Sequence, residues 1–186
     1  LFFRKREPFM DEEKINHGSQ LEGFDEDELA ELLQVYFEDS DEQIEILSDE
    51  LLIIETGTYS QTNIDNVFRI MHSMKSTSLS FGFNKIGEIF HKLENIFDEI
   101  RKDKKVFDER ILDLAFFSIE IFTKIFLKLK KNEDYSSEKD EIEKKIEDYL
   151  SGKSEISPEK IYSPAEVTDK TSEDPSSFQE KSIRIK

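Results

Sequence analysis

Apolar residues recur at three- and four-residue spacing along most of the chain, which predicts amphipathic helices. The first helix is expected to span about residues 26–55, where Asp25 can cap the first turn and Glu28 can complete a capping box. Residues 56–58, Thr-Gly-Thr, are expected to end it. Its apolar stripe predicts one face that is buried along most of the helix. The stripe consists of Leu29, Leu32, Leu33, Tyr36, Phe37, Ile44, Leu47, Leu51 and Ile54.

The same periodicity predicts two further helices on either side of a break at residues 81–84, Phe-Gly-Phe-Asn. The second helix is expected over about 62–80, with Thr62 and Asp65 as its capping box, and the third over about 84–102. Each helix has its own apolar stripe, so the two helices are expected to share a core. The stripes consist of Val67, Ile70, Met71 and Met74 in the second helix, and of Ile86, Phe90, Leu93, Phe97 and Ile100 in the third.

Two more helices are expected, over about 108–131 and about 138–150. The fourth is apolar over a wide arc and must therefore be largely buried. The fifth can begin at a capping box formed by Ser137 and Asp140, and Gly152 can stop it. Short connections between long helices imply antiparallel neighbours. The expected fold class is therefore all-α: an antiparallel up-down four-helix bundle with a fifth C-terminal helix packed on one end or side.

The two ends of the chain show no sustained apolar period. Residues 1–24 mix charge, Gly and Pro and are expected to form a flexible lead-in, which leaves 25–151 as the folded domain. Residues 152–186 are rich in Ser, Pro, Glu and Lys, a composition typical of a disordered linker. Cutting the chain after Lys153 is accordingly expected to leave the melting temperature within about 2 °C.

Composition excludes several classes of function. The net charge of −17 argues against a nucleic-acid binder, which needs a basic surface, and against binding to anionic lipid. The absence of cysteine excludes disulfides and thiolate chemistry and suits a cytoplasmic protein. No run of residues approaches the roughly 20 apolar residues of a membrane span. We therefore expect a cytoplasmic protein without membrane insertion.

Polar residues whose side chains could take part in a reaction face away from the buried stripes of the second and third helices. At about 100° per residue, His72 falls toward the side opposite the stripe of its helix. Lys75 and Ser76 lie one turn further on, so they share that face. Two antiparallel helices can therefore present a histidine and a lysine on one helix, and a histidine and carboxylates on the other. The row beside the buried stripe of the third helix consists of Gly87, His91, Glu94 and Asp98.

The spacing of these residues resembles the histidine phosphotransfer (HPt) domain, most closely the N-terminal phosphotransfer domain of the chemotaxis histidine kinases. The family pattern is roughly H-x-x-K-G-x-S, then a Gly-containing break, then H-x-x-E-N. This chain has HSMKSTS at 72–78, FGF at 81–83 and HKLEN at 91–95, and the general layout extends over about 25–150. Ser76 departs from the family glycine, which lets a partner approach closely. That departure bears on how a partner fits.

The resemblance implies a function in two-component signalling of the chemotaxis type. His72 would accept a phosphoryl group from an ATP-binding kinase domain and pass it to an aspartate on the receiver domain of a response regulator. ATP and Mg would be bound by the kinase domain, so no cofactor is expected on this chain. The chain would be a phosphoacceptor without a nucleotide site of its own, as one part of a sensor histidine kinase. The linker expected over 152–186 would then lead to a further kinase domain.

The expected chemistry requires a neutral imidazole nitrogen of His72 as the nucleophile. Glu94 can orient the ring, because a carboxylate that accepts the Nδ1–H bond leaves the lone pair on Nε2 and stabilises developing positive charge. Lys75 can offset the charge of the phosphoryl oxygens. His91 matches a second family histidine, which the resemblance implies supports the phosphorylated ring through hydrogen bonds.

Partner contacts are expected around His72. Phe68 and Leu79 lie on its side of the second helix and can supply apolar contacts to a receiver domain, with Ser76 between them in the partner-binding surface. Since a bundle helix can bury a wide stripe, Phe68 and Leu79 can equally belong to the core. The residues alone leave these two interpretations open.

Three different functions compete with phosphotransfer within a kinase. A metal site could use the two helix histidines with Glu94 and Asp98, but a di-iron bundle needs Glu-x-x-His on two helices and two further glutamates. The chain has a single reversed His-x-x-Glu, so metal binding is disfavoured. The second alternative is a stand-alone phosphorelay carrier. The third is a non-catalytic helical adaptor with a degenerate motif.

Overall fold

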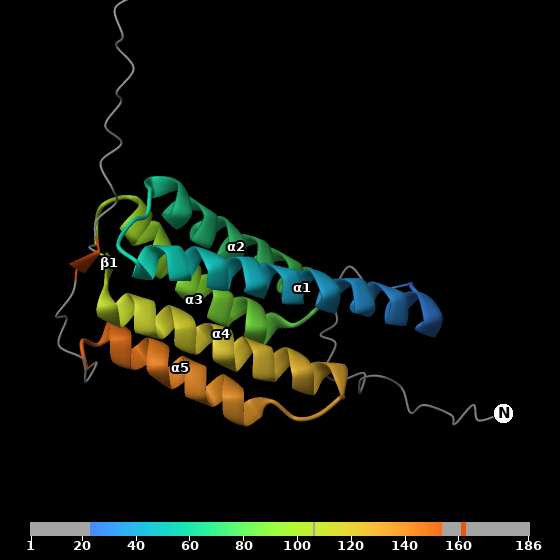
Figure 1. Cartoon of the computed structure of the whole chain (residues 1–186). Helices are drawn as coiled ribbons and strands as arrows, with labels where there is room; N and C mark the ends of the chain where they lie inside the picture. Colours follow the sequence, from blue (N-terminus) through green and yellow to red (C-terminus); the bar gives the residue numbers. More distant parts are fainter. Residues whose placement is uncertain (1–22, 106, 154–160, 163–186) are drawn as a thin grey trace, which may run out of the picture.

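The computed structural model describes residues 23–105, 107–153 and 161–162 of the chain. Within these residues consecutive helices run in opposite directions, with α1 to α4 in a bundle and α5 along the outside of α4 (Figure 1). The prediction of an all-α bundle with a fifth helix is confirmed. The helices are α1 (Glu26–Glu55), α2 (Gln61–Ser80), α3 (Asn84–Arg101), α4 (Glu109–Lys130) and α5 (Ser136–Leu150).

Side chains cap the N-termini of the first two helices. Asp25 Oδ1 accepts from the backbone N–H groups of the first turn of α1, and Glu28 Oε2 accepts from the backbone N–H of Asp25 at 3.0 Å, so this predicted capping box is confirmed. The box predicted at 62–65 is wrong. Asn63 Oδ1 accepts from the backbone N–H of Ser60 at 2.8 Å, and α2 therefore begins one residue earlier than expected.

The last two helices begin differently from each other. Asp108 caps α4 and accepts from the backbone N–H groups of its first turn. The capping box predicted at 137–140 is wrong, because α5 starts at Ser136, whose backbone N–H donates to Asp134 Oδ1 at 3.2 Å. Several polar residues near these starts satisfy the same pattern, and the tertiary position of the chain selects among them.

Aromatic side chains join the helices in the core. Phe90 of α3 and Phe122 of α4 stack with ring centroids 3.9 Å apart. Tyr36 of α1 stacks on both phenylalanines of the break between α2 and α3, Phe81 and Phe83, at 4.8 and 5.1 Å. These contacts hold the break against α1 and so fix the position of the turn between α2 and α3.

Two glycines set the approach of α2 to α3. Gly82 has a φ of +79°, in the left-handed region that glycine adopts at little cost, and it reverses the chain. Gly87 faces Leu79, and a Cβ on Gly87 would lie 2.6 Å from the Leu79 side chain and 3.5 Å from the backbone oxygen of Lys75. The missing side chain therefore allows the second half of α2 to lie close against the start of α3.

A short antiparallel pair joins residues far apart in the sequence. Strand β1 (Phe107–Asp108) pairs with β2 (Ile161–Tyr162), with Phe107 opposite Tyr162. Tyr162 is buried, and its ring meets that of Phe107 edge-on at a centroid distance of 5.9 Å. The prediction of a disordered linker over 152–186 is wrong at these two residues, because one apolar side chain in a two-residue strand has no period to detect. Most of that range, and of the predicted lead-in, lies outside the described residues.

Removing the residues after Lys153 is therefore expected to destabilise the bundle, contrary to the expectation from sequence. Loss of the Tyr162 contact should cost about 1–2 kcal/mol of unfolding free energy, which corresponds to a fall of about 3–8 °C in melting temperature for a domain of this size. Thermal unfolding followed by circular dichroism measures it. A chain cut after Tyr162 is the matched control and should keep the full melting temperature. Equal melting of the two truncated chains would show that the strand pair contributes nothing.

Among the described residues, no helix combines the length and the apolar character needed to cross a membrane.

Candidate functional site

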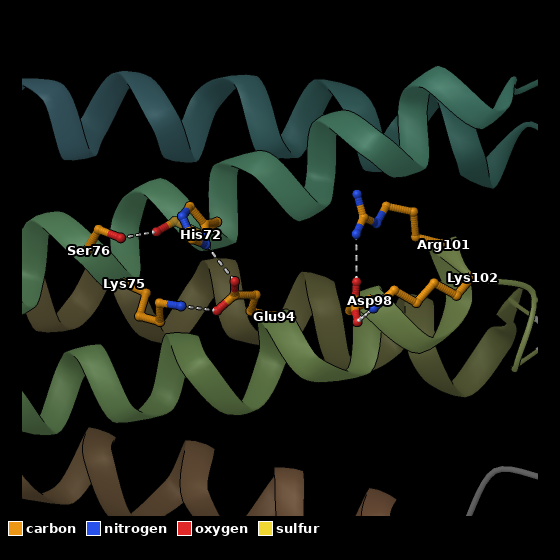
Figure 2. A network of polar contacts seen from close by, with 7 residues as sticks. All are labelled: His72, Lys75, Ser76, Glu94, Asp98, Arg101 and Lys102. Carbon is orange, nitrogen blue, oxygen red and sulfur yellow. Dashed lines mark hydrogen bonds and ion pairs between the residues drawn. The ribbon is translucent and has the colours of Figure 1, made fainter.

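One carboxylate joins His72 and Lys75, which the sequence predicts on one face of α2. Glu94 Oε1 lies 2.6 Å from His72 Nδ1, and Glu94 Oε2 accepts from Lys75 Nζ at 2.6 Å. Figure 2 shows the carboxylate on α3 between the imidazole and the ammonium, both of which reach it from α2. The structure therefore brings together three of the residues that the sequence motif predicts as a site.

The three side chains differ in exposure. The side chain of His72 is 56% exposed, that of Lys75 20% and that of Glu94 9%. The sequence places Glu94 in a row beside the buried stripe, a position that would leave it on the surface, but the close approach of α2 covers its side chain. The imidazole is thus open to a partner, while the carboxylate that contacts it is sheltered from water.

The environment of Glu94 keeps it ionised at neutral pH. Burial by itself would raise its pKa, but hydrogen bonds from Lys75 and His72, together with the charge of Lys75, outweigh burial and hold the pKa below its ordinary value of 4.5. A carboxylate is an acceptor only, so Nδ1 of His72 must carry the hydrogen in this contact. The lone pair of the neutral imidazole then lies on Nε2, the nitrogen that Glu94 does not contact.

His91 is not part of this cluster. It is exposed on α3, one turn before Glu94. In the part of the chain that the structure describes, no hydrogen bond joins it to His72, Lys75 or Glu94. Its supporting role stays a prediction that rests on the family motif.

The three predicted partner contacts lie along α2 on both sides of His72. Phe68 is half-buried, and its ring is nearly parallel to that of His72, with the ring centroids 6.2 Å apart. Leu79 packs on Gly87 but is 41% exposed. The Ser76 hydroxyl donates to the backbone oxygen of His72 at 2.9 Å, so it bonds within its own helix. Their contact with a partner stays a prediction.

Sequence reasoning missed one contact near the site. The guanidinium carbon of Arg101, at the end of α3, lies 4.0 Å from the centroid of the Phe68 ring on α2. Basic residues at the C-terminal end of a helix oppose the helix dipole, which accounts for a cation at this position but not for its contact with α2. The signal in the sequence was the three-residue spacing of Asp98 and Arg101, which predicts an ion pair but not its direction toward α2.

No group of three or more His, Cys, Asp or Glu side chains in the described residues is arranged to hold a metal ion. The cluster at the site contains one histidine, one carboxylate and one ammonium. An ammonium that is bound to the carboxylate competes with a cation for the same oxygen atoms.

A helical bundle with an exposed imidazole, held by a carboxylate on the neighbouring antiparallel helix, matches the class of proteins that the sequence motif indicates. The family model described as Hpt domain matches residues 31–132, more than half of the chain. The chain belongs to the Hpt domain family, and the prediction of a histidine phosphotransfer domain is confirmed.

Among individual proteins, the chain is similar to several that are named chemotaxis protein CheA. It is 30% identical to that of Borreliella burgdorferi over 94 residues, which are 50% of this chain and 11% of that protein. It is 28% identical to that of Listeria monocytogenes over 85 residues, 46% of this chain and 14% of that protein. For that of Bacillus subtilis the values are 25% over 93 residues, 50% and 14%. The chain thus matches only a small part of each relative.

Proposed function

We propose that His72 carries a phosphoryl group between two partner domains in a two-component signalling pathway of the chemotaxis type. The observation that supports this most directly is the 2.6 Å contact between Glu94 and Nδ1 of an exposed His72 ring. It leaves Nε2 with a lone pair, on a side chain that a partner can reach. The similarity to proteins named chemotaxis protein CheA supports the kind of pathway.

In the first step, Nε2 attacks the γ-phosphorus of ATP held with Mg by a kinase domain. The N–P bond forms as the P–O bond to ADP breaks, and the imidazole gains positive charge. Glu94 stabilises that charge through the Nδ1–H bond. Lys75 places a second cation beside the site and also holds Glu94 through its other oxygen.

In the second step, a carboxylate oxygen of a receiver aspartate attacks the phosphorus. The O–P bond forms, the N–P bond breaks, and the imidazole becomes neutral again. Phe68, Ser76 and Leu79 surround His72 on α2 and supply the surface on which the partner docks. The same chemistry serves a domain of a longer histidine kinase and a stand-alone phosphorelay carrier.

The full relay is tested in two stages with purified components. The ATP-binding kinase domain of a CheA-type kinase, without its own phosphotransfer domain, should transfer label from γ-labelled ATP to this chain. After ATP is removed, a chemotaxis response regulator should take up most of that label within minutes, because an acyl phosphate forms readily from a phosphoramidate.

A response regulator whose acceptor aspartate is replaced with alanine is the matched control and should leave the label on this chain. Label that stays on the chain with either regulator would contradict the carrier role, whereas a chain that takes up no label in the first stage would favour a non-catalytic adaptor.

A further inference from the structure

Besides the Glu94 contact, the His72 ring has an aromatic neighbour that is itself contacted by a cation. Phe68 lies one turn before His72 on α2, and the two ring planes differ by 22° with centroids 6.2 Å apart. The guanidinium carbon of Arg101 lies 4.0 Å from the centroid of the same Phe68 ring. Phe68 therefore contacts the imidazole and is itself contacted by a cation from the neighbouring helix.

The guanidinium is held in place from α3. Arg101 Nη2 donates to Asp98 Oδ1 at 2.8 Å, and Lys102 Nζ donates to the other oxygen, Oδ2, at 2.5 Å. Figure 2 shows this pair of ion contacts beyond Glu94 along α3. Within the described residues, Arg101 Nε is buried without a hydrogen-bond partner. A buried unpaired N–H group is costly, and the position over the ring accounts for why the side chain is nevertheless held there.

The His72 ring needs such support. More than half of its side chain is exposed, and Glu94 holds it by a hydrogen bond at a single atom, Nδ1. One hydrogen bond leaves the ring free to tilt about the contact, which would move Nε2. The neighbouring Phe68 ring restricts that tilt, and the strength of this restraint depends on how firmly Phe68 is fixed.

We propose that Arg101 is a positioning residue that fixes Phe68 against the His72 ring and so aims Nε2 at the phosphoryl donor. The inference deepens the proposed function, on which it rests. It predicts that the loss of Arg101 slows the attack on phosphorus even when no partner protein has to dock. The expected loss is about 3–10-fold, a small part of what orientation can contribute to a reaction.

The test uses the full chain and phosphoramidate, a small donor that transfers its phosphoryl group to imidazole and releases ammonia. Arg101→Ala should react at His72 about 3–10-fold more slowly than the unchanged protein, and Arg101→Lys should recover part of the rate because it keeps a cation over Phe68. Lys102→Ala is the matched control. It removes the other cation bound to Asp98 but leaves the ring contact, so its rate should be unchanged.

Two further measurements separate positioning from a general effect on the fold. The exposed His91 should react with the same donor, and its rate in Arg101→Ala should stay unchanged as an internal reference. In NMR spectra, Arg101→Ala should increase the ring motion of His72 and shift its ring protons as the Phe68 ring moves away. Lys102→Ala should do neither.

Three results would overturn the proposal. An unchanged rate and spectrum of His72 in Arg101→Ala would show that the ring needs no such support. A loss seen only with the kinase domain, and not with phosphoramidate, would make Arg101 a docking residue. Equal slowing of His72 and His91, with a lower melting temperature and no rescue by lysine, would make it structural. An Arg101-dependent reaction with phosphoramidate, without any transfer from the kinase domain, would instead contradict only the proposed function.

Discussion

Replacement of His72 by glutamine is expected to abolish phosphorylation of the chain by a kinase domain. Glutamine keeps a polar side chain of similar reach, but the lone pair of its amide nitrogen is delocalised into the carbonyl group, so it is not a nucleophile. The His72 side chain is 56% exposed, so the substitution should leave the melting temperature within about 2 °C. Loss of label with an intact fold would assign the loss to chemistry.

The label itself identifies the bond. Phosphohistidine is a phosphoramidate, so the label on the unchanged protein should be labile in acid and stable in alkali. Label with these properties that persists in His72→Gln would move the phosphoacceptor to His91 or His17 and contradict the assignment. His91→Gln is an informative companion, because the structure places His91 outside the hydrogen-bonded cluster.

The fold was largely accessible from the sequence because its signals are local and repeated. In α1 the apolar stripe continues over many turns, and Asp25 with Glu28 marks the start, so both ends could be predicted. At α2 two overlapping polar pairs satisfy the same capping pattern, and the backbone path from Tyr59, which is buried, selects Ser60. The pairing of β1 with β2 could not be predicted, because a two-residue strand carries too little pattern.

The candidate site was accessible only in part. The spacing of the motif placed His72, Lys75 and Glu94 on facing helices, since side chains on adjacent turns of a helix share a face. The burial of Glu94 depends on the distance between α2 and α3, which the contact of Gly87 with Leu79 sets. Helix periodicity gives the direction of a side chain but not how closely a neighbouring helix covers it. The contact of Arg101 with Phe68 has the same origin.

Burial changes what the loss of Glu94 should do. Had it stood on an exposed face, Glu94→Ala would have cost less than about 0.5 kcal/mol of stability. Its side chain is 9% exposed and accepts hydrogen bonds from both His72 and Lys75. Removing it leaves a partly buried ammonium without its acceptor, so we expect a loss of about 1–3 kcal/mol.

The same substitution should slow phosphorylation by about 10²-fold, the low end for a group that orients or activates a nucleophile. The ring loses the acceptor that fixes its tautomer and stabilises its positive charge, but it can still reach the reactive tautomer. Glu94→Gln should lose less, because its amide oxygen can still accept the Nδ1–H bond of His72 although the charge is gone. The difference between the two variants measures the orienting contribution separately from the charge.

Lys75→Ala should have a smaller effect on the rate than Glu94→Ala, because the contact between Glu94 and His72 remains. Salt should reduce that effect only in part, since the Lys75 side chain is 20% exposed and screening acts mainly on exposed charges. Phosphorylation rates at low and high salt, with a melting curve for each variant, test both expectations. Wild-type rates in Glu94→Ala would show that Glu94 does not orient the ring. A folded Glu94→Gln as slow as Glu94→Ala would show instead that the carboxylate acts through its charge alone.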